Sequence, residues 1–469
     1  MKIAFMHYHL KTGGVTTVLK QQLNAIGKKW QALVLTGLPP ETSFPADFVH
    51  IPELGYSSHY KNPINPDDAA ESIINAICNK FNGLCDVLHV HNPTLAKNKH
   101  FLEILKSLKK KGLNLFLQIH DFAEDGRPYA YFTDEYPSDC HYGVINQRDY
   151  DILLAAGLKK KGLHRLVNTV NPNPIKPHLK FKKPLVLYPI RAIRRKNIGE
   201  AILLSLFFIR SQTLVITLPP NSPSDIKSYE GWKAFVKEHN LNLDFDKGLH
   251  CDFEALVLSA DFLITSSITE GFGFSFLEPW LFEKLLWGRN LPDICRDFTR
   301  NGVRLDHLYD ALFVPLDWIN LRRFNRRWTA CVLNAGMLFN LSTDMTLVLN
   351  AFDFITKNGV IDFGLLDETA QKEVILRLIS SKKAAEKLIH INPFLANPGM
   401  VSDKSERIHT NKRIIQKCYD PALTHQRMLS LYEKVVTTPV KQSIDKTALA
   451  TAFLDLEKFS LLKWSDYGH

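Results

Sequence analysis

Short apolar runs alternate with longer segments of helical periodicity along most of this chain. In the first half the pattern predicts strands at about 3–6, 32–35, 86–91, 113–119 and 142–146, and helices at about 15–26, 69–81 and 101–108. It resumes with strands at about 185–188, 213–218 and 261–265, and helices at about 198–208 and 229–239. Such alternation predicts an α/β protein with doubly wound parallel sheets, which bind ligands at the carboxyl ends of their strands.

A proline-rich stretch separates the two α/β halves. Pro172, Pro174 and Pro177 fall within seven residues, and a helix interior does not accommodate them. We therefore expect a linker over 171–184, between an N-terminal Rossmann-like domain at 1–170 and a C-terminal Rossmann-like domain at 185–430.

Two further segments interrupt or follow the alternation. The stretch from about 297 to 390 is rich in tryptophan, phenylalanine and arginine, and it predicts a helical insertion in the C-terminal half. An acceptor pocket or a membrane contact is the alternative for this stretch. Residues 431–469 are expected to form a helical tail, in which 447–464 predicts one amphipathic helix.

Charge and cysteine usage narrow the class of protein. The net charge is +10, but the basic runs at 106–111 and 159–161 have no interleaved aromatic residues, so nucleic acid is not an expected partner. Peripheral contact with anionic lipid, or with an acidic acceptor, stays open. Seven cysteines without a C-x-x-C pair, and no signal-like or membrane-spanning apolar run, predict a cytoplasmic location.

The stretch from Ser266 to Glu278 combines two glutamates and two glycines in a strand–turn–helix setting. We expect the strand at 261–265 to lead through a glycine turn into a helix over 274–287. Free N–H groups at such a turn and at a helix N-terminus attract anions. Glu270 lies in the turn, and Glu278, about two turns into the helix, would lean back toward it. The alternative is that Glu278 merely complements the helix dipole.

Glu270-Gly271-Phe272-Gly273 followed by Leu277-Glu278 resembles the E-x7-E signature of retaining nucleotide-sugar glycosyltransferases of the GT-B fold, especially glycosyltransferase family 4. The resemblance covers roughly residues 1–300 and 405–435. It implies that Glu270 holds hydroxyls of the donor sugar and that Glu278 holds the nucleotide ribose. The N–H groups of Gly271, Phe272 and Gly273 would face the sugar and the distal phosphate. It also implies that the C-terminal tail crosses back to the first domain.

A basic loop follows the first strand of the second half. Arg191 and Lys196 have the R-x4-K spacing of the family pair that clamps the donor diphosphate. An arginine fork and a lysine point charge suit that role. Arg194 and Arg195 offer alternative registers, and a solvated basic loop is the structural alternative.

The first half contributes further candidates at strand ends. Gly13 and Gly14 precede a helix and resemble the glycine loop that family members place between donor phosphate and acceptor. His120 occupies the place of a family histidine that bonds the donor sugar, and Asp121 would orient His120 or accept from the acceptor hydroxyl. His91 is either a structural cap or an acceptor contact. His7 and His9 share a side of a strand end, but without a third ligand no metal is expected.

Together these residues and the resemblance imply a retaining hexosyltransferase. It would move a hexosyl unit from a nucleoside-diphosphate sugar to a hydroxyl of a carbohydrate or other small polar acceptor. Arg191, Lys196 and the glycine-turn amides would stabilise the leaving diphosphate, so neither a metal nor another cofactor is expected. A glycoside phosphorylase on the same scaffold, a nucleotide-sugar epimerase and a catalytically silent glycan- or partner-binding module remain as alternatives.

Overall fold

The computed structural model describes residues 1–27, 30–41, 43–59, 64–170 and 184–467, which form two compact units. Unit 1 comprises Met1–Asn171, Phe339–Leu341 and Tyr419–Leu454. Unit 2 comprises Pro172–Leu338, Ser342–Cys418 and Asp455–His469. The predicted linker at 171–184 lies outside the described residues except for Pro184.

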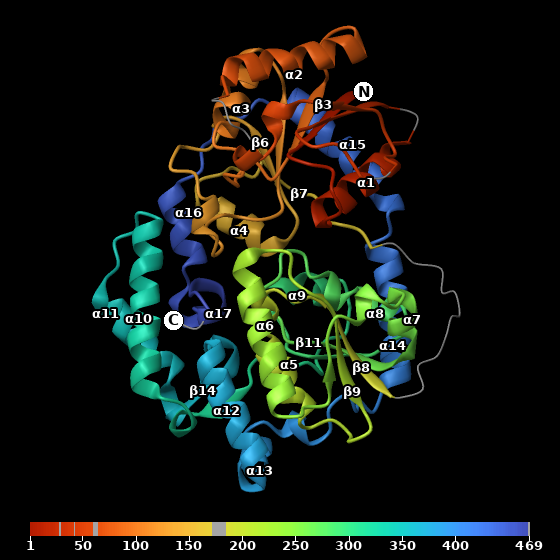
Figure 1. Ribbon diagram of the computed structural model, residues 1–469. Coiled ribbons are helices and arrows are strands. Elements are labelled where there is room, and N and C mark those ends of the chain that lie inside the picture. Colours follow the sequence, from red (N-terminus) through yellow and green to blue (C-terminus); the bar gives the residue numbers. More distant parts are fainter. Residues whose placement is uncertain (28–29, 42, 60–63, 171–183, 468–469) are drawn as a thin grey trace. The chain divides into compact units, whose positions relative to one another are not determined.

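Unit 1 contains a parallel sheet of seven strands in the order β3-β2-β1-β4-β5-β6-β7 (Figure 1). The strands are β1 (Lys2–His7), β2 (Gln31–Thr36), β3 (Phe48–His50), β4 (Val87–His91), β5 (Leu115–Ile119), β6 (His141–Val144) and β7 (Leu163–Arg165). The helices are α1 (Gly14–Ile26), α2 (Pro66–Phe81), α3 (Phe101–Lys110), α4 (Gln147–Ala155), α15 (Ala422–Thr437) and α16 (Lys446–Phe453).

Both faces of this sheet are covered, which explains why its strands are continuous apolar runs. On one face, strand residues such as Leu88 and Leu117 pack with side chains of α2, α3, α4 and α16. On the other face, Phe5 and Phe116 pack with α1 and with Met428 and Tyr432 of α15. Helices α15 and α16, from near the C-terminal end of the sequence, therefore complete the core of the first α/β unit.

Unit 2 contains a five-stranded parallel sheet in the order β10-β9-β8-β11-β12. Its strands are β8 (Leu185–Arg191), β9 (Thr213–Leu218), β10 (Leu243–Asp244), β11 (Ala260–Thr265) and β12 (Leu286–Gly288). The helices of this α/β part are α5 (Ile198–Ser205), α6 (Pro223–Glu238), α7 (Phe253–Ser259), α8 (Glu278–Leu281), α9 (Pro292–Arg300) and α14 (Lys404–Cys418). The predicted fold class, two doubly wound α/β sheets, is confirmed.

The helix predicted over 274–287 is wrong. A 3₁₀ turn, η7 (Phe274–Phe276), is followed by the four-residue helix α8, of which Glu278 is the first residue. Pro279 is tolerated in a first helical turn but not in a helix interior, so the helix can only begin here. Glu283 then adopts a left-handed conformation (φ 57°), and β12 begins at Leu286.

The stretch at 297–390 adds helices and a small sheet to unit 2. Antiparallel β13 (Phe313–Pro315) and β14 (Val360–Asp362) accompany α10 (Leu321–Leu338), α11 (Met345–Ile355), α12 (Glu368–Ser380) and α13 (Lys382–Ile391). Trp328 of α10 is fully buried, and its indole N–H donates to the carbonyl oxygen of Phe459 at 3.1 Å. This stretch thus has its own core, which the C-terminal residues help to close.

The single helix predicted over 447–464 is also wrong. The chain forms α16, the 3₁₀ turn η12 (Leu456–Lys458) and α17 (Leu461–Trp464) instead. The side chains of Asp455 and Ser460 accept hydrogen bonds from backbone N–H groups two residues on, which starts a new turn each time. Within the described ranges, no helix combines the length and the apolar character needed to cross a membrane.

Candidate functional site

The strand order of unit 2 reverses between β8 and β11, and open α/β sheets bind ligands at such a switch point. The loops that leave these two strands contact each other there. The N–H of Ile268 donates to the carbonyl oxygen of Arg195 at 3.0 Å, and Ser266 Oγ donates to that of Lys196 at 3.1 Å. Tyr188 Oη, from β8, also donates to the Lys196 carbonyl oxygen, at 2.7 Å. The backbone that carries Lys196 is thereby fixed.

Glu270, which is buried, forms an ion pair at this switch point with Lys196, which is half-buried. Burial alone would raise the pKa of Glu270, but Lys196 and Arg195 hold it below its ordinary value. Burial lowers the pKa of Lys196, and the attraction of Glu270 partly offsets this. Glu270 is 7% exposed, so its ionised form depends on the two cations. An ammonium group has three donors, which leaves Lys196 able to donate to a ligand as well.

Glu278 stands beside this pair with a different environment. The residue is exposed to solvent at the start of α8. The protein atoms around its carboxyl group nevertheless remove part of the hydration of that group, and this loss raises its pKa to about 7. Lys196 opposes that rise, so the two groups are within electrostatic reach. Glu278 is thus an accessible carboxyl group that titrates near neutral pH. Glu283, by contrast, lies on the surface and pairs with Lys412 at 2.6 Å.

The three arginines of the basic loop have different partners. Arg191 is exposed, and its Nη1 donates to the carbonyl oxygen of Pro219 at 3.0 Å. Arg194 has a structural role, because its Nε and Nη2 donate to the two carboxylate oxygens of Glu368 at 2.6 and 2.9 Å. Arg195 lowers the pKa of Glu270 and so faces the ion pair. Of the two arginines that were alternatives for diphosphate binding, Arg195 therefore lies near the site, whereas Arg194 is not available to a ligand.

The glycine turn is built around Gly273. Its φ of 89° favours glycine, and a Cβ there would meet side-chain atoms of Ile294 at 3.0 Å and of Phe276 at 3.2 Å. The following turn is a three-residue 3₁₀ segment rather than a long helix, so it supplies little of the dipole that the sequence predicted. Any anion binding at Gly271, Phe272 and Gly273 would therefore depend on individual N–H groups.

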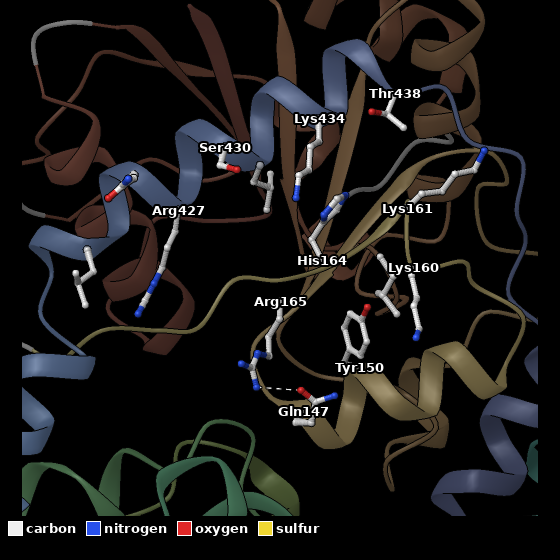
Figure 2. Close-up of a pocket in the computed structure, with 14 residues that line it drawn as sticks. Gln147, Tyr150, Lys160, Lys161, His164, Arg165, Arg427, Ser430, Lys434 and Thr438 are labelled. Atoms are coloured by element: carbon white, nitrogen blue, oxygen red, sulfur yellow. Dashed lines mark hydrogen bonds between the residues drawn. The ribbon is translucent and has the colours of Figure 1, made fainter. Parts of the chain in front are cut away.

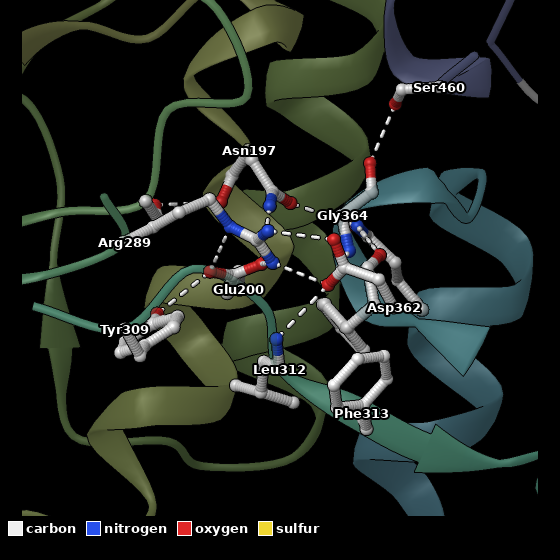
Figure 3. Close-up of polar contacts among 12 residues, drawn as sticks. Asn197, Glu200, Arg289, Tyr309, Leu312, Phe313, Asp362, Gly364 and Ser460 are labelled. Carbon is white, nitrogen blue, oxygen red and sulfur yellow. Dashed lines mark hydrogen bonds and ion pairs between the residues drawn. The ribbon is translucent and has the colours of Figure 1, made fainter. Parts of the chain in front are cut away.

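A buried polar network begins at Asn197, the residue after Lys196, and includes Glu200 and Arg289 (Figure 3). Asn197 adopts a left-handed conformation (φ 52°), and its Nδ2 donates to Glu200 at 2.7 Å. Arg289 donates to Glu200 at 2.8 and 2.6 Å and to Asp362 of β14 at 2.8 and 2.7 Å. Buried charges are tolerated only when paired and hydrogen-bonded, as these are.

The stretch at 297–390 and the C-terminal residues contact this loop directly. From α12, Gln371 Nε2 donates to Asn197 Oδ1 at 2.8 Å, and Glu368 accepts from Arg194. Arg194 also donates to the carbonyl oxygen of Ser465. Sequence reasoning missed these partners, because each lies far along the chain from the loop. Glu200 and Arg289 are each a single charged residue in an apolar segment of the sequence. This pattern is the local signal that a charged residue could be buried and need a partner.

In unit 1, His120 and His91 come together at the ends of β5 and β4. Their Nε2 and Nδ1 atoms are 2.9 Å apart, and the rings stack at 5.2 Å. Burial lowers the pKa of His120 to about 4, with Asp121 opposing the shift, and lowers that of His91 well below its ordinary value. Both imidazoles are therefore neutral near pH 7. His91 Nε2 has no hydrogen-bond partner among the described residues.

Asn92 positions this pair, and the sequence did not reveal it. Its Oδ1 accepts from the N–H groups of His120 and Asp121 at 2.7 and 3.1 Å, and its φ is 53°. The Asp121 carboxylate pairs with Arg127 at 2.8 Å. Gly13 and Gly14 are exposed at the start of α1, where a Cβ would meet no atom closer than 3.9 Å, so local packing does not require glycine.

His7 and His9 lie near the same strand ends. Their ring centroids are 5.1 Å apart, and that of His7 is 6.1 Å from His91. Burial lowers the pKa of His7 to about 3 and also lowers that of His9. The described residues include no group of three or more histidine, cysteine or acidic side chains placed to hold a metal ion. The predicted site residues thus form one group at the β4–β5 end of unit 1 and another at the β8–β11 end of unit 2.

Comparison with known proteins bears on both units. No family model matches the chain. A mannosylglucosyl-3-phosphoglycerate synthase of Petrotoga mobilis is 27% identical to it, with 78% of this chain and 79% of the relative covered. Among solved structures, a sucrose-phosphate synthase from Thermosynechococcus elongatus superimposes with a TM-score of 0.53 and 14% identity, over 92% of this chain and 98% of that chain.

Anabaena HepE in complex with UDP and glucose gives a TM-score of 0.52 with 11% identity, over 92% of this chain and 99% of that chain. The fold is that of the GT-B glycosyltransferases. The comparisons confirm the predicted fold class and the prediction of an enzyme of glycosyltransferase type. They leave the roles of individual residues as predictions.

Proposed function

We propose that this protein is a retaining, metal-independent glycosyltransferase that moves a hexosyl unit from a nucleoside-diphosphate sugar to an acceptor hydroxyl. The observation that carries the proposal is the partly buried Lys196–Glu270 pair at the switch point of unit 2, with Glu278 accessible beside it. Such a donor needs a cation for its diphosphate, a carboxylate for its sugar hydroxyls and a second carboxylate for its ribose. The complexes of HepE with UDP-glucose, and with UDP and glucose, support a nucleotide sugar as the donor class.

Each unit 2 residue has a chemical task in this proposal. Lys196 donates to the diphosphate, while Glu270, kept ionised by Lys196 and Arg195, accepts from sugar hydroxyls. Glu278 accepts from the ribose hydroxyls. Arg191 is exposed at the end of β8 and is free to turn from Pro219 toward a phosphate. Charge develops on the diphosphate as the C1–O bond breaks, and preorganised cations stabilise it there.

Retention follows from the family resemblance. The acceptor oxygen would attack C1 from the side of the leaving group, and its proton would pass to the departing phosphate oxygen. No side chain then serves as a nucleophile. Because Lys196, Arg191 and the amides of residues 271–273 supply the positive character, the proposal needs no metal or other cofactor.

In unit 1 we assign His120 to the donor sugar and His91 and Asp121 to the acceptor. A neutral imidazole has one donor and one acceptor nitrogen, which suits sugar hydroxyls better than a charged ring does. Gly13 and Gly14 leave the space above α1 open to a substrate. The relative's name indicates a product in which sugars are joined to 3-phosphoglycerate, so a carbohydrate that carries an anionic group is our preferred acceptor class.

Calorimetric titration of the full chain with UDP, GDP, ADP and orthophosphate tests the proposal. We expect one nucleoside diphosphate to bind, Glu278→Ala to weaken that binding, and His120→Ala to leave binding intact while lowering turnover. Turnover is followed as release of that nucleotide, and the anomer of the product by NMR. Binding of orthophosphate alone would transfer the assignment to a phosphorylase, and binding of no compound would favour a silent module.

A further inference from the structure

A basic pocket of about 910 Å³ lies along the edge strand β7 of unit 1 (Figure 2). One wall comes from α4 and from the turn that precedes β7, and the other comes from α15. The pocket therefore joins segments about 270 residues apart in the sequence, Gln147–Arg165 and Leu423–Thr438. Its volume is within the range, about 300–1,000 Å³, of pockets that hold small molecules.

The charge in this pocket has one sign only. Five cationic side chains line it, and no aspartate or glutamate does; they are Lys160, Lys161, Arg165, Arg427 and Lys434. For Lys160, Lys161 and Lys434, the described part of the chain offers no ion-pair partner. Like charges gathered in a concavity repel one another and raise the local concentration of anions.

Neutral hydrogen-bonding groups complete the lining. Gln147, Tyr150 and Ser430 face the pocket, and Arg165 Nη1 donates to Gln147 Oε1 at 3.0 Å, which orients the guanidinium. Such groups recognise the oxygen atoms of a phosphate as well as its charge.

His164 contributes no charge, and its hydrogen bonds fix its tautomer. The carbonyl oxygen of Thr438 can only accept, so His141 Nε2 donates to it at 2.8 Å. His141 Nδ1 must then accept from His164 Nε2, also at 2.8 Å. Burial, His141 and Lys434 lower the pKa of His164 to about 4. The positive charge of the pocket therefore comes from its lysine and arginine side chains.

We propose that this pocket binds a small polyanion with two or more phosphate groups. A single charge would leave most of the charge of Lys160, Lys161 and Lys434 uncompensated, whereas several phosphates reach both walls at once. Among the lining residues, the rings available for stacking are those of Tyr150 and His164, and the His164 ring already stacks on His141, so a nucleic acid strand is less well matched. The site is distinct from the Lys196 loop, which belongs to unit 2.

Titration with tripolyphosphate tests the proposal in a Lys196→Ala background, which removes the main cation of the other anion site. Lys160→Gln with Lys434→Gln takes one charge from each wall and should weaken binding by about tenfold or more. Lys106→Gln with Lys110→Gln removes the same charge from α3 in the same unit and should leave binding unchanged. Hydrogen exchange should show protection of peptides 160–165 and 423–438 on binding.

Three results would overturn the inference. The first is equal affinity in the pocket variant and its parent, and the second is an equal loss in the α3 variant, which would mean non-specific surface charge. The third is binding to vesicles with phosphatidylserine, sensitive to the pocket variant, without binding of tripolyphosphate; this would identify a membrane surface instead. Because the parent already lacks Lys196, failure here leaves the proposed transferase activity untouched.

Discussion

The pKa of Glu278 makes the ribose assignment testable by pH. Loss of hydration around the carboxyl group raises the pKa of Glu278 to about 7. Ribose hydroxyls donate hydrogen bonds, so a nucleotide should bind the ionised carboxylate and lower this pKa. Affinity must then rise with pH, because at low pH the carboxylate first has to lose a proton.

The size of the effect follows from the fraction ionised. With a pKa of about 7, that fraction rises roughly tenfold between pH 6 and pH 8. The Glu278 side chain is exposed, and solvent screening reduces such shifts, so we expect a rise in nucleotide affinity of about three- to tenfold. Calorimetric titration across this pH range with the nucleoside diphosphate that binds measures it directly.

Glu278→Gln is the control, because the amide keeps the shape of the side chain but does not titrate. The nucleotide's own phosphate titrates in the same range, and that contribution is common to both proteins. The difference between the two pH profiles therefore isolates Glu278. Identical profiles, with affinity rising in both, would refute the assignment of Glu278 to the ribose.

Other perturbations address the ion pair, the loop and the fold. Lys196→Met should lower kcat/KM by about 10²–10³, measured with the matching donor, since it removes a preorganised cation and leaves Glu270 buried without its partner. Arg194→Gln should lower the free energy of unfolding of unit 2 by about 3 kcal/mol in a urea titration, because buried Glu368 loses a bidentate partner, whereas exposed Arg191→Gln should change it little. Acid should destabilise unit 1 below pH 6.5. Imidazoles in the unfolded chain take up protons there, whereas the buried imidazoles do so only near pH 3–4. The free energy of unfolding should therefore fall by about 1.4 kcal/mol per pH unit for each such histidine. Burial lowers the pKa of His7 and His89 to about 3 and that of His120 to about 4. Hydrogen exchange at pH 7 and 5 checks the prediction, and a flat profile would contradict these lowered pKa values.

The core strands could be predicted because they are buried on both faces. Runs such as 3–6, 32–35 and 185–188 are continuously apolar, and each lies within a strand of the structure. The edge strands β3, β7, β10 and β12 have two or three residues each, too few to show any periodicity. Their positions depend on pairing with a neighbour, which a sequence window does not contain.

The motifs located the Lys196–Glu270 pair, but the helix assigned to Glu278 was wrong. The apolar spacing beyond Glu278 favours a helix, but Pro279 cannot lie in a helix interior, and in the structure the helix begins only at Glu278. The task of Arg194 could not be predicted at all. Its partner Glu368 is 174 residues away, and three neighbouring cations look equivalent until the partner is known.

The stretch at 297–390 shows why a motif alone describes such a site incompletely. It departs from the pattern of the family that the sequence resembles, yet its helix α12 supplies Glu368 to Arg194 and Gln371 to Asn197, on either side of Lys196. Asn197 holds a left-handed conformation that isolated asparagine adopts only at some cost, and the Gln371 and Glu200 contacts stabilise it. The orientation of the Lys196 ammonium group toward Glu270 therefore depends on residues that no local pattern connects to it.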